Sequence, residues 1–163
     1  MRPQGAFSNN LRSCMRIAIA SDHGGYRMKN ILKQYLATEL QIEIVDDFGP
    51  YDSNSVDYPD FAVMVARSVA NGSYDIGIML DGVGIGSSMA ANKIPGVLCA
   101  NCWDDFTANN AREHNHANML CIGAQIVGDS LAKAIVKKFI QTEPADGRHA
   151  ARVSKIKALE PVR

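Results

Sequence analysis

The sequence predicts an α/β fold, a three-layer α/β/α sandwich around a five-stranded, parallel, Rossmann-like sheet. Short apolar runs alternate along the chain with segments whose apolar residues recur at helical spacing. Strands separated by helices form βαβ units, which build a parallel sheet covered on both faces. One apolar run, residues 74–80 (YDIGIML), leads directly into a glycine-rich loop. It is therefore expected to be a buried strand with a ligand site at its carboxyl end.

The first half of the chain contains two strands and two helices. Residues 16–20 form a short apolar strand, and residues 26–40 follow as a helix because their apolar side chains recur three and four positions apart. The segment 41–48 (QIEIVDDF) alternates apolar and polar residues, as a half-buried strand does. Residues 49–59 are rich in Gly, Pro, Ser and Asp and predict a loop, after which a helix is expected at 60–71.

The second half repeats this alternation. After the strand at 74–80 and its glycine loop, the Met-Ala-Ala content of residues 88–93 suits the first turns of a helix. The remaining elements follow from the same apolar spacing. They are strands at 97–102 and 119–122 and helices at 104–112, 130–140 and 150–159.

Length and charge limit the organisation and the function classes. A chain of 163 residues fits one domain, expected at residues 15–163 after a disordered extension at 1–14. Seventeen basic and seventeen acidic side chains cancel, so nothing indicates nucleic acid or an anionic membrane as a partner. No apolar run is long enough to span a bilayer.

The cysteines indicate a reducing compartment. Four of them in a chain of this length do not form a disulfide scaffold, so a cytoplasmic location is expected. Cys99 and Cys102 match the pattern CxxC, but no second pair or histidine cluster completes a zinc site. They are expected to be core or strand-end residues, and no metal site is predicted.

The loop after residue 80 organises the chain. Its glycines occupy alternate positions, which lets a ligand approach main-chain N–H groups closely. A strand, a glycine loop and a helix N-terminus together make an anion pocket. The loop matches neither the phosphate loop GxxxxGK[ST] nor the dinucleotide pattern GxGxxG, and a tight turn without a ligand is the alternative. It consists of Asp81, Gly82, Val83, Gly84, Ile85, Gly86 and Ser87.

Polar side chains gather in four further segments. Asp22 and His23 follow the first strand, and Tyr58 lies in the loop after the second. The segment 112–116 (REHNH) precedes the fifth strand, and 147–152 (GRHAAR) lies near the C-terminus. Because ligands bind at the carboxyl ends of strands in open α/β sheets, these groups are expected to converge around the glycine loop.

Five motifs occur in the order SDHGG, VDYPDFA, DGVGIGSSMAANK, REHNHANM and GRHAARV. With them, residues 15–160 resemble the type B ribose-5-phosphate isomerases and the related galactose-6-phosphate isomerase subunits. The resemblance implies an enzyme that interconverts phosphorylated aldoses and ketoses through a cis-enediolate, without a metal or another cofactor. It also implies a homodimer or homotetramer with active sites between subunits.

The resemblance assigns roles to individual residues. It implies that His114 opens the sugar ring, that loop N–H groups hold an oxyanion, and that Arg148 and Arg152 bind the phosphate. Arginine forks suit a phosphate dianion, and histidine exchanges protons near neutral pH. Taken alone, each of these side chains would be interpreted as a surface residue; the joint pattern favours a site. The substrate-binding positions are Asp22, His23, Tyr58, Gly82, Val83, Gly84, Ile85, Gly86, Ser87, Asn115, Arg148 and Arg152.

The sequence departs from the family at the catalytic base. Where the common branch has a cysteine, this chain has Asp81, and where that branch has a threonine it has Val83. Another branch places a glutamate where this chain has Ser87, and many members have an arginine at the position of Gln125. An aspartate at the base position is similar to the A subunit of galactose-6-phosphate isomerase, which works with a cysteine-bearing B subunit.

Three functional interpretations follow. The leading one is a homomeric isomerase of phosphorylated sugars in which Asp81 is the catalytic base. In the alternative role, Asp81 is structural and caps the following turn through its N–H groups. The second interpretation is an A-type subunit that needs a cysteine-bearing paralogue to supply the base. The third is a non-catalytic sugar-phosphate sensor.

Overall fold

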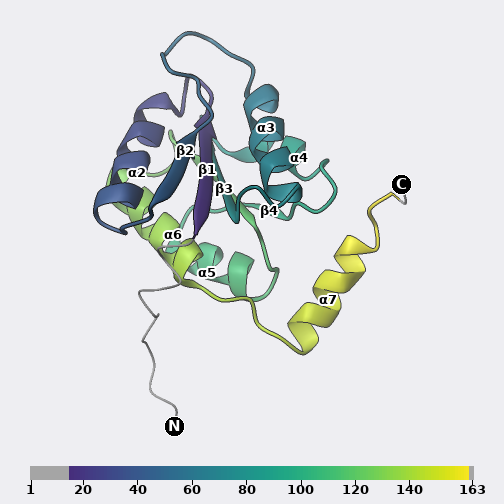
Figure 1. Cartoon of the computed structure of the whole chain (residues 1–163). Helices are drawn as coiled ribbons and strands as arrows, with labels where there is room; N and C mark the ends of the chain where they lie inside the picture. The colour runs from purple at the N-terminus through teal and green to yellow at the C-terminus, as the bar shows by residue number, and fades with distance from the viewer. Residues whose placement is uncertain (1–14, 162–163) are drawn as a thin grey trace.

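A computed structural model describes residues 15–161, which fold into three layers with a parallel sheet in the middle (Figure 1). Adjacent strands of the sheet follow the order β2-β1-β3-β5-β4. This confirms the predicted fold class; the extension expected at 1–14 lies outside the described residues. The strands are β1 (Arg16–Ser21), β2 (Ile44–Asp47), β3 (Ile76–Asp81), β4 (Cys99–Asn101) and β5 (Met119–Gly123).

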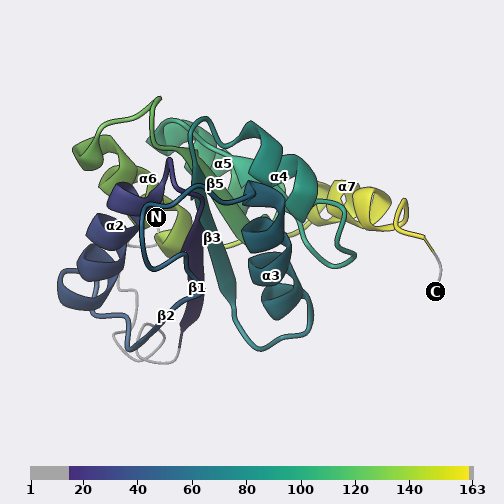
Figure 2. The ribbon, with the colours of Figure 1, turned by 90° about the horizontal axis from the view of Figure 1, so that it is seen from above.

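The helices cover both faces of the sheet, as Figure 2 shows from above. Three of them, α2, α5 and α6, pack on one face, and α3 and α4 pack on the other. The last helix, α7, projects beside the sheet at the end of a long connection (Figure 1). The helices are α2 (Tyr26–Thr38), α3 (Tyr58–Ala70), α4 (Ile85–Ala91), α5 (Asp105–Glu113), α6 (Asp129–Gln141) and α7 (Arg148–Lys157).

Strand β3 is the centre of the molecule. All six of its residues are buried, because β1 and β5 flank it and helices cover both its faces. A Cβ added at Gly77 would lie 2.7 Å from the Val65 side chain, so this glycine lets α3 pack closely on the strand. Ser21 pairs with Leu80 and Asp81 with Gly123, so the carboxyl ends of β1, β3 and β5 are level with one another.

The chain leaves β1 toward β2 on one side, whereas β3 lies on the other side of β1. Such a reversal opens a crevice at the carboxyl ends of the two neighbouring strands, where α/β proteins bind ligands. Here the reversal lies between the residues after β1 and those after β3. The Asp22 N–H donates to the Leu80 carbonyl at 2.9 Å, which fixes the two strand ends against each other.

The loop that follows β2 is fixed by a buried lysine. The Nζ atom of Lys29, whose side chain is fully buried, donates to Asp47 Oδ1 at 2.7 Å and to the Pro50 carbonyl at 2.5 Å. Lys33 donates to the other carboxylate oxygen of Asp47 at 2.8 Å. Burial alone would raise the pKa of Asp47, but the hydrogen bonds from both lysines outweigh it, so the pKa lies below its ordinary value. This pairing secures the start of the loop that leads to α3.

Three helices begin more than one residue earlier than the sequence predicts. Helix α3 begins at Tyr58 and not at residue 60, because Pro59 suits the first turn of a helix, so Tyr58 lies at the start of α3 and not in a loop. The other two begin earlier for a different local reason. Helix α4 begins at Ile85 and not at residue 88, because Gly84 takes a left-handed conformation (φ 81°) that turns the chain directly into the helix. Helix α7 begins at Arg148 and not at residue 150, after Gly147 with φ 67°. In both places a glycine with positive φ ends the loop earlier than the apolar pattern indicates.

Candidate functional site

Three predicted segments meet at the carboxyl ends of β1 and β3. We call Asp22, His23, Tyr58 and residues 81–87 the carboxyl-edge set. Asp22 Oδ1 accepts from the Gly25 N–H at 2.9 Å, and a Cβ added at Gly24 would lie 3.4 Å from the Gly82 nitrogen. A Cβ at Gly86 would lie 2.5 Å from the Tyr58 ring. The glycines therefore let the polar side chains after β1 and β2 approach the glycine loop.

The carboxylate of Asp81 is turned into its own loop. Its Oδ1 atom accepts from the Val83 N–H at 2.9 Å and from the Gly84 N–H, and its Oδ2 atom accepts from Ser87 Oγ at 2.5 Å and Ser87 N at 3.3 Å. The residue is only 4% exposed. Three of the N–H groups that were expected to hold an oxyanion are therefore occupied by this carboxylate. The geometry matches the capping role that was the alternative for Asp81.

The N–H groups at the start of α4 remain available. Within residues 15–161, the N–H groups of Ile85 and Gly86 have no hydrogen-bond acceptor. The first N–H groups of a helix lack intrahelical partners and carry partial positive charge. The oxyanion donors of this loop are thus limited to N–H groups that Asp81 does not reach, which include those of Ile85 and Gly86.

Sequence reasoning missed Asn101, the last residue of β4. Its Nδ2 atom donates to the Val83 carbonyl at 3.2 Å, and a Cβ at Gly84 would overlap its amide group. Its Oδ1 atom is buried and has no partner among the described residues. The signal was present, because Asn101 is a polar residue at the carboxyl end of a predicted strand, as Asp22 and Asp81 are.

The other predicted residues lie at the opposite edge of the sheet. We call His114, Asn115, Arg148 and Arg152 the amino-edge set. Helix α5 follows β4 and runs back, so His114, its C-terminal cap, lies close to the start of β5, where the Asn118 carbonyl accepts from the Gly77 N–H at 3.0 Å. The expected convergence of all polar loops on the glycine loop is therefore wrong within a single chain, because a crossover helix carries its end to the amino edge.

The His114 ring is held on two sides. Its Nδ1 atom accepts from the Asn110 side-chain amide at 2.8 Å, which leaves the ring proton on Nε2, and Nε2 lies 3.9 Å from a carboxylate oxygen of Glu113. The His149 ring stacks on it with centroids 3.9 Å apart and planes 8° from parallel. The His114 side chain is 38% exposed, so Nε2–H can meet a ligand from outside the chain.

Helix α7 is attached near its two ends and also packs through Val153, which is buried in the middle of the helix. The Ala145 N–H donates to the Glu113 carbonyl at 2.8 Å before the helix, and the Gly96 N–H donates to Glu160 Oε1 at 2.9 Å after it. Arg148 and Arg152 are both exposed, and neither has an acidic partner within ion-pair distance among residues 15–161. Two guanidinium groups on one side of a helix, four residues apart, are available for an anion.

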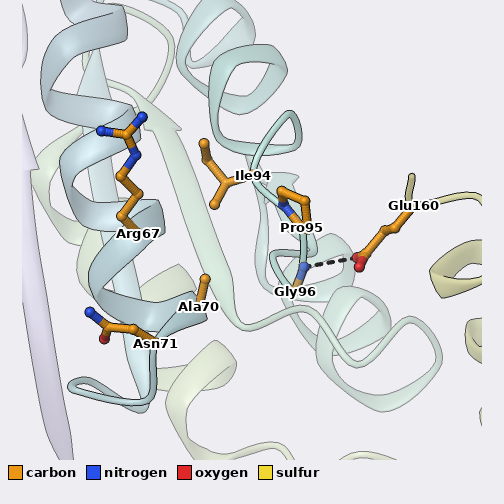
Figure 3. A pocket seen from close by; sticks show the side chains of 7 residues that line it. All are labelled: Arg67, Ala70, Asn71, Ile94, Pro95, Gly96 and Glu160. Carbon is orange, nitrogen blue, oxygen red and sulfur yellow. Dashed lines mark hydrogen bonds between the residues drawn. The ribbon is translucent and has the colours of Figure 1, made fainter. Parts of the chain in front are cut away.

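One cavity lies apart from both sets. It has a volume of about 610 Å³ and lies between the end of α3 and the segment after α4 (Figure 3). The Glu160 carboxylate on its rim is engaged with the Gly96 N–H, as the dashed line in Figure 3 marks. None of the predicted site residues lines it. The lining residues are Arg67, Ala70, Asn71, Ile94, Pro95, Gly96 and Glu160.

The described residues contain no group of three or more His, Cys, Asp or Glu side chains that could hold a metal ion. None of the helices in residues 15–161 has the length and apolar character needed to cross a membrane.

Known proteins resemble this chain in sequence and in fold. A family model described as ribose/galactose isomerase matches residues 17–156. The chain belongs to this family. A putative sugar phosphate isomerase of Bacillus subtilis is 47% identical over 146 residues, which cover 90% of this chain and 97% of the relative. The family predicted from the five motifs is thereby confirmed, and so is the enzyme class, an isomerase.

Two further family relatives bear on the site. The galactose-6-phosphate isomerase subunit LacA of Enterococcus faecalis is 40% identical over 89% of this chain and 99% of its own length. The crystal structure of ribose-5-phosphate isomerase B from Mycoplasma genitalium with bound ribulose-5-phosphate superposes with a TM-score of 0.85 and 43% identity, over 90% of this chain and 97% of that one. Both a ribose-5-phosphate isomerase B and a protein named as a galactose-6-phosphate isomerase subunit are therefore similar to this chain.

Proposed function

We propose that the protein is an aldose–ketose isomerase of phosphorylated sugars, with ribose 5-phosphate and ribulose 5-phosphate as the leading pair. The observation that carries the proposal is the division of the family's motifs into two complementary sets. One edge of the sheet presents a carboxylate, a glycine loop and polar groups, and the other presents an imidazole and two unpaired arginines. Together they contain a base, an acid and a phosphate-binding pair.

The active site in this proposal is built from two chains of a homodimer, or of two such dimers in a homotetramer. The two sets cannot meet within one chain, because the sheet separates them. The segments after β3 and β4 also carry exposed apolar side chains, and contiguous exposed apolar surface is typical of interaction sites. These side chains are Val83, Ile85, Met89, Trp103 and Phe106, with exposures from 44% to 75%. A second chain would cover them and bring its amino-edge set to the glycine loop.

The proposed reaction is a sequence of proton transfers with no net gain or loss of atoms. Nε2–H of His114 of the partner subunit gives its proton to the ring oxygen, solvent water takes the proton of the C1 hydroxyl, and a solvent proton then restores His114, so the ring opens with no net change in atoms. Arg148 and Arg152 of the partner subunit hold the phosphate dianion in their planar forks. Asp22, His23 and Tyr58 bind the sugar hydroxyl groups.

The central step moves the proton on C2 of the open sugar to C1, while the proton of the C2 hydroxyl passes to the C1 oxygen, so that the aldehyde becomes a ketone with no net change in atoms. Asp81 is the base in the homomeric form of the proposal, and the Asn115 amide of the partner subunit and the N–H groups of Ile85 and Gly86 donate to the enediolate oxygen. Asp81 must therefore exchange at least its Ser87 contact for the substrate when the sugar binds. We also propose a cytoplasmic location, which the free thiols of Cys99, Cys102 and Cys121 support.

A second candidate is a heteromeric isomerase, in which a cysteine-bearing paralogue supplies the base. Two observations favour it. The Asp81 carboxylate is engaged by donors of its own loop, and a relative that is 40% identical is named as a subunit of galactose-6-phosphate isomerase. In this form the chain still contributes its amino-edge set to the partner's glycine loop.

A substrate panel tests the proposal. The purified protein is incubated with ribose 5-phosphate, galactose 6-phosphate, allose 6-phosphate and erythrose 4-phosphate, and ketose formation is followed. Turnover of any of them by this chain alone supports the homomeric enzyme. A folded protein that turns over none of them contradicts it. Activity that appears only when a cysteine-bearing paralogue is added assigns the heteromer, and tight sugar-phosphate binding without turnover in either assay assigns a sensor.

A further inference from the structure

We propose that His149 is a positioning residue. Its ring holds the His114 imidazole in the orientation needed for ring opening, and it links that imidazole to Arg148, the preceding residue on α7. This inference rests on the proposed function, because it gives His149 a part in the step assigned to His114. His149 lies between the two residues that contact opposite ends of the substrate in that proposal. Arg148 binds the phosphate and His114 meets the ring oxygen.

The contact joins two segments that are 35 residues apart. His114 caps the C-terminus of α5, and His149 is the second residue of α7. Their rings are stacked, 8° from parallel with centroids 3.9 Å apart. The connection between them is held independently, because His116 Nε2 lies 2.8 Å from the Ala145 carbonyl and the Ala145 N–H donates to the Glu113 carbonyl. The stack is therefore not required merely to close this loop.

Two side chains restrict the motion of His114. Asn110 donates to its Nδ1 atom at 2.8 Å and fixes one edge of the ring in the ring plane. His149 covers one face and prevents the ring from turning out of that plane. Only the Nε2 edge and the second face remain open. A side chain with two rotatable bonds needs two such restraints to present a single proton donor in one direction, and misplacement of about 1 Å costs a large part of catalysis.

The surroundings of His149 lower its pKa and so favour the neutral ring. Burial lowers the pKa of His149, and the positive charges of His114, Arg148 and Arg152 lower it further, whereas Glu113 on α5 acts in the opposite direction. Arg148 Nε lies 3.5 Å from His149 Nε2 in donating geometry, which also favours the unprotonated nitrogen. A neutral ring can stack on the imidazole of His114 when that imidazole takes up a proton, because no like charge opposes it.

A bound phosphate would change this balance. A dianion placed between Arg148 and Arg152 offsets the charges that lower the pKa of His149. The sugar's phosphate end is thereby coupled to the residues that act on its ring end.

The test compares two variants with a matched control. His149→Phe keeps a flat neutral ring, His149→Ala removes it, and Glu160→Ala loosens the far end of α7 without touching the stack. We expect His149→Ala to lower kcat on ribose 5-phosphate by about tenfold with a smaller change in KM, and His149→Phe to recover most of the loss. Turnover of erythrose 4-phosphate should change little in both variants, because its phosphorylated C4 oxygen cannot close a furanose ring.

The outcomes separate the possible roles. Equal losses on both sugars, or the same loss in Glu160→Ala, would make His149 a structural anchor of α7 and overturn the proposal, as would unchanged activity of His149→Ala. NMR chemical shifts detect the stacking of the two rings independently of catalysis. The ring protons of His114 should be shifted upfield in the native protein and in His149→Phe, and not in His149→Ala. Added inorganic phosphate should raise the titration midpoint of His149. If the native protein has no isomerase activity, the proposed function fails, whereas missing ring-current shifts contradict the stack alone.

Discussion

The carboxyl-edge set and the amino-edge set differ in how the chain satisfies its own polar groups. In the first, Asp22 and Asp81 are at most 8% exposed and accept hydrogen bonds from main-chain N–H groups of their own loops. In the second, Arg148 and Arg152 are exposed and have no acidic partner among the described residues. The first set is therefore preorganised by its own chain, whereas the second presents charges that a ligand or a second chain must satisfy.

This difference indicates which changes act through stability and which act through binding. Removing a buried acceptor leaves N–H donors unsatisfied, at a cost of about 1–3 kcal/mol each. Removing an exposed arginine costs the fold little, because its guanidinium makes no buried contact. Substitutions in the two sets should therefore differ in whether they change stability or binding.

The largest effect is expected at Asp81. In Asp81→Asn one carboxylate oxygen becomes an NH₂ group, which cannot act as a base. This NH₂ group would also face the N–H of Ser87 or of Val83, so two hydrogen-bond donors would point at each other. We expect turnover to fall by about a hundredfold or more, the low end for the loss of general-base catalysis, while substrate still binds. Steady-state kinetics with isothermal titration measures both. An Asp81→Asn protein that keeps its turnover would remove Asp81 from the mechanism and leave it as a cap.

A cysteine introduced at position 81 tests both the catalytic and the capping role of this residue. Asp81→Cys combined with Val83→Thr should keep or raise turnover if the loop follows the geometry of the common branch. Its thermal stability should nevertheless fall, because a thiol is a poorer acceptor than the carboxylate for the N–H groups of Val83 and Gly84. Higher stability together with higher activity would contradict the capping role of Asp81.

The next effect is expected at Arg148. Arg148→Ala should raise KM for a sugar phosphate by about thirtyfold, equivalent to roughly 2 kcal/mol for a lost charge-assisted hydrogen bond, with the melting temperature unchanged. Arg67→Ala is the matched control, because Arg67 is also an exposed helix arginine but lines the separate cavity. A similar KM increase in both variants would mean that the protein's general positive charge, and not the amino-edge set, attracts the phosphate.

The smallest effect on activity is expected at Lys29, which fixes the loop leading to α3. Lys29→Met should lower the free energy of unfolding by about 2 kcal/mol, because Asp47 keeps Lys33 and the Gly49 N–H but loses its buried partner. Since the pKa of Asp47 is depressed in the folded state, its contribution is present above its unfolded pKa, near 4, and is lost as pH falls through the lower folded pKa. The stability difference between the native protein and Lys29→Met should therefore shrink in acid. Urea titrations at pH 7 and pH 3 measure it, and a constant difference would show that the ion pair is not its source.

The sequence was sufficient for the order of elements, the central strand and the glycine loop, because apolar spacing and glycine positions are local properties. It could not show that Asp81 would bind its own loop, since those N–H groups suit a ligand equally well. The predicted helix at 104–112 and strand at 119–122 were in fact enough to place His114 at the opposite edge of the sheet, because a crossover helix ends beside the amino end of the next parallel strand. The contact of His114 with His149 depends on the path of a 142–147 connection that has no periodic pattern.

In the proposed dimer, one active site combines the carboxyl-edge set of one chain with the amino-edge set of another. Complementation between Asp81→Asn and Arg148→Ala chains tests it most directly. A two-fold mixed dimer contains one site with both native residues and one with neither. Equal mixing yields such dimers as about half of the population. At substrate concentrations far below KM, where both parents are nearly inactive, we therefore expect recovery of about a quarter of native activity. Verified mixed dimers whose activity stays at the average of the two parents would contradict it.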